Sequence, residues 1–80
     1  MRLDKFLKLS RIIKRRTVAN EVCSGGRVKV NGSTAKPAHT LKEGDLVTIA
    51  FGNREVKAKV LSVDEKLGNR DPKALYEGVD

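Results

Sequence analysis

The chain has 80 residues, a net charge of +7, one cysteine and one histidine. This length allows one small domain, and the sequence has neither a secretory leader nor an apolar run near the roughly 20 residues of a membrane helix. A single cysteine and a single histidine cannot form an internal disulfide or a metal-ligand cluster, so we expect no cofactor. Because no leader or membrane helix is expected, we also expect no membrane partner and a cytoplasmic location.

The predicted elements begin with a short helix. The apolar pattern from Leu3 to Leu7 fits one helical face, but its phase slips at Ser10. It predicts a helix over residues 4–9, followed by a turn or irregular segment to residue 14.

A second helix is predicted over residues 17–24. Thr17 is a plausible N-cap, and Gly25-Gly26 is a plausible stop signal. Because residues four apart share a helical face, four residues are expected to form its buried side: Val18, Ala19, Val22 and Cys23.

After Gly26 the apolar residues alternate with a period of two, which is typical of strands. Asn31-Gly32 is a strong hairpin signal, and the return strand is expected to end by Pro37. Arg27 and Lys29 are expected on the outer face of the first strand, opposite its apolar side.

A second pair of strands is predicted over residues 46–51 and 54–63, joined by a type II′ turn at Gly52-Asn53. With those of the first strand, the residues expected to point into the core are Val28, Val30, Val47, Ile49, Phe51, Val56, Ala58 and Val60.

The sequence therefore predicts an α+β fold, with two short N-terminal helices packed on a small, bent, mainly antiparallel sheet of about four strands. We expect one domain over residues 1–63 and a short C-terminal tail over residues 64–80. Two alternatives stay open for this tail, which are a short helix from Pro72 through Tyr76 and disorder.

Positive charge is concentrated at the start of the chain. Residues 1–36 contain ten basic and two acidic side chains, a net +8, whereas residues 37–80 sum to −1. Such asymmetry indicates a polyanion-binding face. The start of the second helix adds free N–H groups that attract phosphate, and hairpin and helix together would form one basic surface if they pack side by side. This argument selects Arg11, Lys14, Arg15, Arg16, Arg27, Lys29 and Lys36.

No catalytic constellation is present, since no motif positions a histidine beside a serine. His39 is expected to be solvated in a loop, and Cys23 to be a small buried hydrophobe. Phe6, Phe51 and Tyr76 are too few for the kind of platform on which single-strand binders stack successive bases, and the two phenylalanines are expected in the core.

Five ordered segments resemble the RNA-binding domain named after ribosomal small-subunit protein four: residues 2–7, 15–19, 25–32, 36–37 and 44–45. The resemblance covers about residues 1–52 and implies a helical pair and hairpin that present a basic face to structured RNA. It carries RNA-binding roles to Arg2, Lys5, Arg11, Arg15, Arg16 and Lys36. Thr17 and Asp4 are expected to organise the site, where Asp4 either complements the helix dipole or holds a nearby arginine.

As a free-standing copy, the chain is similar to the RqcP family and, more distantly, to the bacterial fifteen-kilodalton heat-shock proteins. The resemblance implies a monomeric, non-enzymatic factor of ribosome-associated quality control. Its partners would be the large ribosomal subunit, large-subunit rRNA, peptidyl-tRNA and a tailing factor of the RqcH type. Three alternatives remain, namely a targeting module for an rRNA- or tRNA-modifying enzyme, a heat-shock rescue factor, and a protein-interaction domain that docks through its tail.

Overall fold

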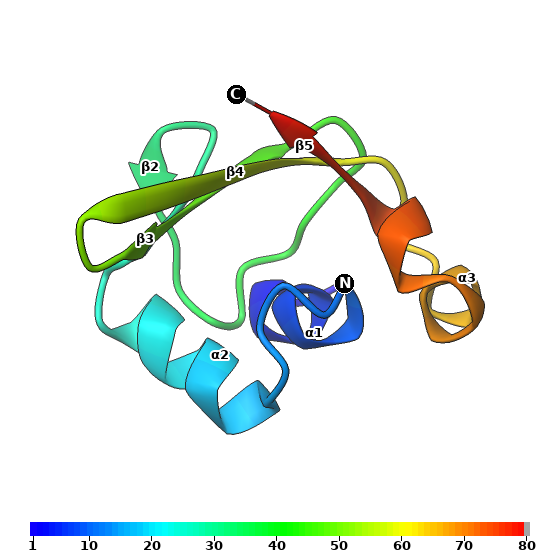
Figure 1. Ribbon diagram of the computed structural model, residues 1–80, viewed down its shortest axis with the longest axis horizontal. Helices are drawn as coiled ribbons and strands as arrows, with labels where there is room; N and C mark the ends of the chain where they lie inside the picture. Colours follow the sequence, from blue (N-terminus) through cyan, green and yellow to red (C-terminus); the bar gives the residue numbers. More distant parts are fainter. Residues whose placement is uncertain (80) are drawn as a thin grey trace.

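The structure, a computed structural model, describes residues 1–79 as helices packed against one face of an antiparallel sheet (Figure 1). The sheet has the order β2-β1-β3-β4-β5 and confirms the α+β class, with one strand more than predicted. Among residues 1–79 no helix is long and apolar enough to cross a bilayer. The elements are α1 (Leu3–Leu9), α2 (Arg16–Ser24), β1 (Val28–Val30), β2 (Ser33–Thr34), β3 (Leu46–Phe51), β4 (Arg54–Val60), α3 (Glu65–Arg70), η1 (Pro72–Leu75) and β5 (Tyr76–Val79).

Helix α1 forms where the sequence predicts it, because Leu3, Phe6 and Leu7 lie on one face and are fully buried. The loop between β2 and β3 holds its first turn. The Leu3 N–H donates to the His39 carbonyl at 2.8 Å, and the Asp4 N–H donates to the Pro37 carbonyl at 3.1 Å. This loop therefore fixes the start of α1 against the sheet.

Helix α2 begins at Arg16, with Arg15 as its N-cap and no capping bond from a side chain. The prediction that Thr17 caps this helix is therefore wrong. Ala19, Val22 and Cys23 are buried as expected, whereas Val18 is 39% exposed. Val18 lies about 100° around the helix from Ala19, outside the narrow stripe that meets the core. Burial, together with the negative charge of Asp4, raises the pKa of the Cys23 thiol to about 11.

The first hairpin confirms the turn prediction. Asn31 and Gly32 have φ values of 52° and 86°, as a type I′ turn requires. The Asn31 side chain also anchors the hairpin to the start of β3, since its Nδ2 donates to Asp45 Oδ1 at 3.0 Å and its Oδ1 accepts from the Leu46 N–H at 2.9 Å. The Lys42 N–H and the Asn31 amide both donate to Asp45 and hold the pKa of its carboxyl below the ordinary value.

Strands β3 and β4 pair from Leu46 with Lys59 to Phe51 with Arg54. Val47 and Ile49 are fully buried, but Phe51 is 37% exposed, so its predicted place in the core is wrong. Phe51 is the last residue of β3, at the hairpin end of the strand.

Strand β4 ends at Val60, three residues earlier than predicted, because the N–H groups of Leu61 and Ser62 turn to the Leu75 carbonyl. Residues 65–79 then form α3, η1 and β5, and β5 pairs with β4 as the fifth strand. The segment from Pro72 is helical, as one alternative predicted, but it is a 3-10 turn that ends at Leu75. Leu75 is fully buried in the common core, and the predicted tail extends to Asp80, which lies outside the described residues.

Candidate nucleic-acid interface

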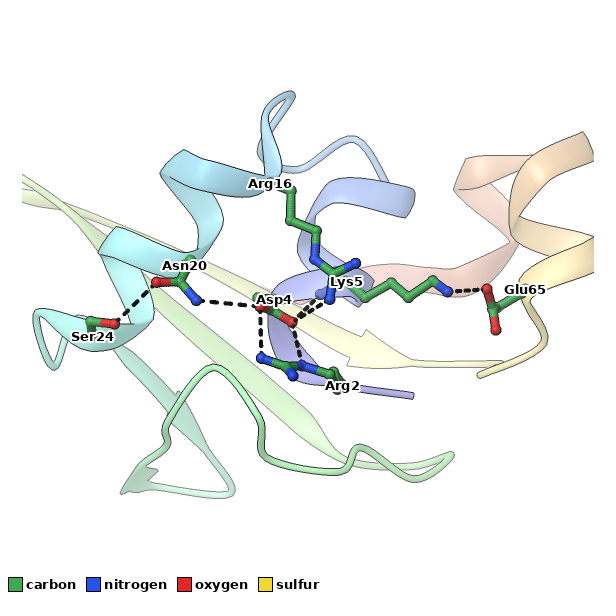
Figure 2. Close-up of polar contacts among 7 residues, drawn as sticks. All are labelled: Arg2, Asp4, Lys5, Arg16, Asn20, Ser24 and Glu65. Atoms are coloured by element: carbon green, nitrogen blue, oxygen red, sulfur yellow. Dashed lines mark hydrogen bonds and ion pairs between the residues drawn. The ribbon is translucent and has the colours of Figure 1, made fainter.

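A buried carboxylate joins Arg2, the N-cap residue of α1, to Arg16, the first residue of α2. Asp4, whose side chain is 3% exposed, accepts from Arg2 Nε at 3.1 Å and from Arg2 Nη2 at 3.2 Å. Arg16 Nη2 lies 3.4 Å from the same carboxylate, and Asn20 Nδ2 lies 3.5 Å from it (Figure 2). We call Arg2, Asp4, Arg16 and Asn20 the Asp4 cluster.

The Asp4 carboxylate is ionised at neutral pH despite its burial. Burial raises the pKa of this carboxyl, but hydrogen bonds from Arg2 and Asn20 and the positive charges of Arg16 and Arg2 outweigh that effect, so the pKa lies below its ordinary value. The cluster therefore holds one negative and two positive charges, a net +1.

The arginines keep most of their hydrogen-bonding capacity for a ligand. A guanidinium has five N–H donors, of which Arg2 uses two on Asp4 and Arg16 uses one. Their side chains are 50% and 48% exposed. Because Asp4 restrains both guanidinium groups, the cluster presents planar donors at a fixed spacing, which suits phosphate oxygens.

Local sequence explains how α2 reaches Asp4. Arg16, Asn20 and Ser24 are four residues apart and form one polar stripe along the helix. Ser24 Oγ donates to Asn20 Oδ1 at 3.4 Å, which leaves the Asn20 amide nitrogen directed at Asp4 (Figure 2). Sequence reasoning missed Asn20, although its spacing from Arg16 is the signal that identifies it.

The two helix N-termini differ in what they offer an anion. In α1 the N–H groups of Leu3, Asp4 and Lys5 already donate, the last to Asp4 Oδ1 at 2.8 Å. In α2 the N–H groups of Arg16 and Thr17 donate to no group within residues 1–79. The start of α2 is therefore the end that can receive phosphate.

Lys5 is paired rather than free. Its Nζ forms an ion pair with Glu65 Oε1 of α3, and the two side chains are 36% and 55% exposed (Figure 2). The sequence did not predict the contact between Glu65 and Lys5, because only the packing of α3 brings Glu65 to α1 and no local pattern indicates it. Its carboxylate offsets one of the positive charges that were expected at the interface.

The structure places the other predicted residues in several different parts of the fold. Lys14 and Arg15 are exposed in the connection that leads into α2, and exposed Lys36 precedes Pro37, whose carbonyl binds the Asp4 N–H. Lys14 and Arg15 directly precede Arg16 in the sequence, and Lys36 directly precedes the residue that holds the Asp4 backbone. Arg11 follows the other end of α1 and lines a separate cleft.

Arg27 and Lys29 do not join the Asp4 cluster. Arg27 follows the far end of α2, and its N–H donates to the Val22 carbonyl at 3.2 Å. Lys29 points away from the helices, because its neighbours Val28 and Val30 are buried beneath them. The expectation of one continuous basic surface from helix to hairpin is therefore wrong for Lys29, which occupies the opposite face of the sheet.

Comparison with known proteins places the chain in a family. The S4 domain model matches residues 1–47, which include the whole Asp4 cluster. The chain belongs to the S4-domain family. It is 51% identical over 77 residues to the RQC P-site tRNA stabilizing factor of Halalkalibacterium halodurans and 53% identical over 77 residues to that of Streptococcus pneumoniae. Each alignment covers 96% of this chain and 88% of the relative.

The fold of this S4-domain protein also has a solved counterpart. The trimeric structure of Vibrio cholerae heat shock protein 15 superimposes with a TM-score of 0.85 at 30% identity. The match covers 99% of this chain and 81% of that protein, so it includes α3, η1 and β5 as well as the S4 domain. The similarity in fold thus extends beyond residues 1–47, which the family model matches.

Proposed function

We propose that this S4-domain protein is a non-enzymatic, RNA-binding factor of ribosome-associated quality control in the cytoplasm. It binds, as a monomer, the large ribosomal subunit that still carries peptidyl-tRNA after stalling and subunit splitting. There it contacts large-subunit rRNA and the tRNA, stabilises the tRNA and supports C-terminal tailing of the stalled chain by a partner of the RqcH type. The names of the two relatives support the role in quality control.

The observation that carries the proposal is the pair of arginines fixed by Asp4. A flexible surface arginine loses side-chain entropy when it binds phosphate, whereas Arg2 and Arg16 are already restrained by hydrogen bonds. Lys14, Arg15 and the start of α2 extend this charge. Contacts of this kind position a protein on folded RNA through its backbone and shape rather than through base sequence.

Co-sedimentation with large ribosomal subunits tests this function. Purified subunits that retain peptidyl-tRNA are mixed with the wild-type protein, Arg16→Ala or Lys42→Ala at low salt. Lys42 is exposed in the loop before β3 and is not a member of the Asp4 cluster, so its replacement removes the same charge and leaves all four members in place. We expect wild type and Lys42→Ala to sediment with the subunits and Arg16→Ala to be depleted. Absence of the wild-type protein from these fractions would refute the proposal.

Heat-shock rescue of stalled large subunits is the second candidate, because the whole fold superimposes on heat shock protein 15. The 51% and 53% identities to the quality-control factors, against 30% to the heat-shock protein, favour the first candidate. Deletion of the gene separates the two. Loss of C-terminal tails from stalled chains supports quality control, whereas intact tails with poor recovery after heat shock support rescue.

A further inference from the structure

A cleft lies beyond the C-terminal end of α1, away from the Asp4 cluster. It consists of two hollows of about 470 and 570 Å³ that share Arg11 and Tyr76 as lining residues. The first hollow is completed by residues of α3 and η1, and the second by the β3-β4 hairpin. Most of its lining comes from residues 51–76, which the S4 domain model does not match.

The cleft is strongly basic. Arg11, Arg54, Arg70 and Lys73 line it, and Asp71 is the one acidic side chain among its lining residues. Within residues 1–79, none of these four cations lies within 4.0 Å of a carboxylate. Their charge is therefore available to an anionic ligand.

The walls of the cleft include two aromatic rings that the sequence places 25 positions apart. Tyr76 is half-buried on β5, and Phe51 is 37% exposed at the end of β3. Partly buried Ile12 and Val56 line the same hollow. Aromatic faces beside cations are what proteins use to stack an unpaired base while they neutralise its phosphates.

The backbone supports a binding role for Arg11. Its φ of 63° lies in the left-handed region, which a residue with a β-carbon rarely adopts. Its N–H donates to the Lys8 carbonyl at 3.1 Å, so the sharp exit from α1 is held in place. Strained conformations of this kind cluster at binding sites, where they aim a side chain.

We propose that this cleft binds an unstacked nucleotide of single-stranded RNA or of an RNA loop. The base stacks on the exposed ring of Phe51, and the flanking phosphates contact Arg11, Arg54, Arg70 and Lys73. The site lies beyond the far end of α1, a helix roughly 10 Å long, so its ligand is distinct from the phosphates at Arg2 and Arg16. The inference goes beyond the proposed function, because it gives this domain a second RNA contact of different chemistry.

Nuclear magnetic resonance titration tests the proposal with three probes, which are single-stranded octauridine, an RNA duplex of eight base pairs and uridine monophosphate. Octauridine should shift the ring signals of Phe51 and Tyr76, whereas the duplex should shift mainly signals of the Asp4 cluster. The chain contains one tyrosine, so the Tyr76 ring is observed without overlap from another.

Affinity measurements on variants complete the test. Phe51→Leu keeps an apolar side chain but removes the ring, and it should weaken octauridine binding about fivefold or more. Arg54→Ala should also weaken it, whereas Lys59→Ala, which removes a charge from the opposite face of the same strand, should not. Arg16→Ala should leave the ring shifts in place, so failure of RNA binding at the Asp4 cluster and failure of this site are distinguishable.

Three results would overturn the inference. One is a set of octauridine shifts confined to the Asp4 cluster, and another is a loss of less than fivefold in Phe51→Leu. The third is uridine monophosphate binding as tight as that of octauridine, which would assign the cleft to a free nucleotide.

Discussion

Arg16 Nη2 lies 3.4 Å from Asp4 Oδ1, which ties the start of α2 to the first turn of α1 across twelve positions of sequence. Arg2 binds the same carboxylate through two nitrogens. Without a shared anion the two guanidinium groups would repel each other. Asp4 therefore joins the helices and sets the spacing of the cations proposed to bind RNA.

Asp4→Asn separates geometry from net charge. The change raises the net charge from +7 to +8, so a purely electrostatic interface would bind RNA more tightly. We expect weaker binding instead, because Arg2 and Arg16 lose their common partner, together with a loss of about 1–3 kcal/mol in the free energy of unfolding. Urea denaturation and RNA titration measure the two effects. Glu43→Gln, an exposed change of the same charge, should keep wild-type stability, and stronger binding by Asp4→Asn would contradict the prediction.

Acid should destabilise the fold through Asp4 and Asp45. The pKa of each carboxyl lies below its ordinary value of 3.8 in the folded state, so the unfolded chain binds more protons as the pH falls. The stabilisation is complete above the unfolded pKa and is lost as the pH falls through the folded pKa. We expect the free energy of unfolding to drop between about pH 5 and pH 3, and to drop less in Asp4→Asn. Urea curves at these pH values measure the drop, and an equal fall in both proteins would argue against this role of Asp4.

The salt dependence of RNA affinity should report how many phosphates the Asp4 cluster contacts. If Arg2 and Arg16 each neutralise one phosphate, Arg2→Ala and Arg16→Ala should each reduce the slope of log K against log salt by about 0.7–0.9. Lys42→Ala should leave the slope unchanged. Binding of a structured RNA between low and moderate salt provides the slopes. Equal slopes in all four proteins would place the phosphates elsewhere.

The ion pair between Lys5 and Glu65 should weaken RNA binding rather than stabilise the fold. Both side chains are partly exposed, so Glu65→Gln should change the free energy of unfolding by less than about 1 kcal/mol. It releases Lys5 beside the Asp4 cluster, and RNA affinity should therefore rise more than in Glu43→Gln. Fluorescence anisotropy with one labelled RNA compares the two variants, and equal gains would show that Lys5 does not contact RNA.

The features predicted from the sequence are those that depend on neighbouring residues. Asn31 and Gly32 require a turn wherever they occur between strands, and the phase slip at Ser10 has a local cause, since its buried hydroxyl donates to the Leu7 carbonyl at 3.2 Å. The role of Asp4 was predicted as one of two alternatives because Arg2 is two positions away. Local charge was sufficient for that inference.

Features that depend on packing between elements far apart in the sequence were not predicted. The burial of Val18 was predicted from its spacing with Val22, but the sheet meets only the neighbouring stripe of α2. Phe51 was assigned to the core by strand alternation, which does not show where a strand passes beyond its covering helices. Tyr76 and Phe51 line the same hollow from opposite ends of β4, since β5 pairs Tyr76 with Val60 and β3 ends at the β3-β4 hairpin. Residues 64–80 carry no strand signal strong enough to predict the pairing of β5 with β4.

Gly68 should be required for the attachment of α3 to α1. A β-carbon at this position would lie 2.8 Å from carbon atoms of both Leu9 and Leu75, closer than packed side chains allow. Leu75 is fully buried and cannot move aside without disturbing the core. Gly68→Ala should therefore lower the free energy of unfolding by about 1–3 kcal/mol, although alanine favours helix. Urea denaturation measures the loss.

Gly78→Ala is the matched control for this change. Gly78 lies on β5, and a β-carbon there would meet no atom within 4 Å. It adds the same methyl group to the same C-terminal segment, and we expect its stability to remain close to that of the wild type.

Because Tyr76 and Lys73 depend on the position of η1, Gly68→Ala should also weaken octauridine binding in the cleft while binding at the Asp4 cluster persists. Equal stability of the two variants would show that α3 can shift to admit the methyl group. Unchanged octauridine binding in Gly68→Ala would show that the cleft does not depend on this contact.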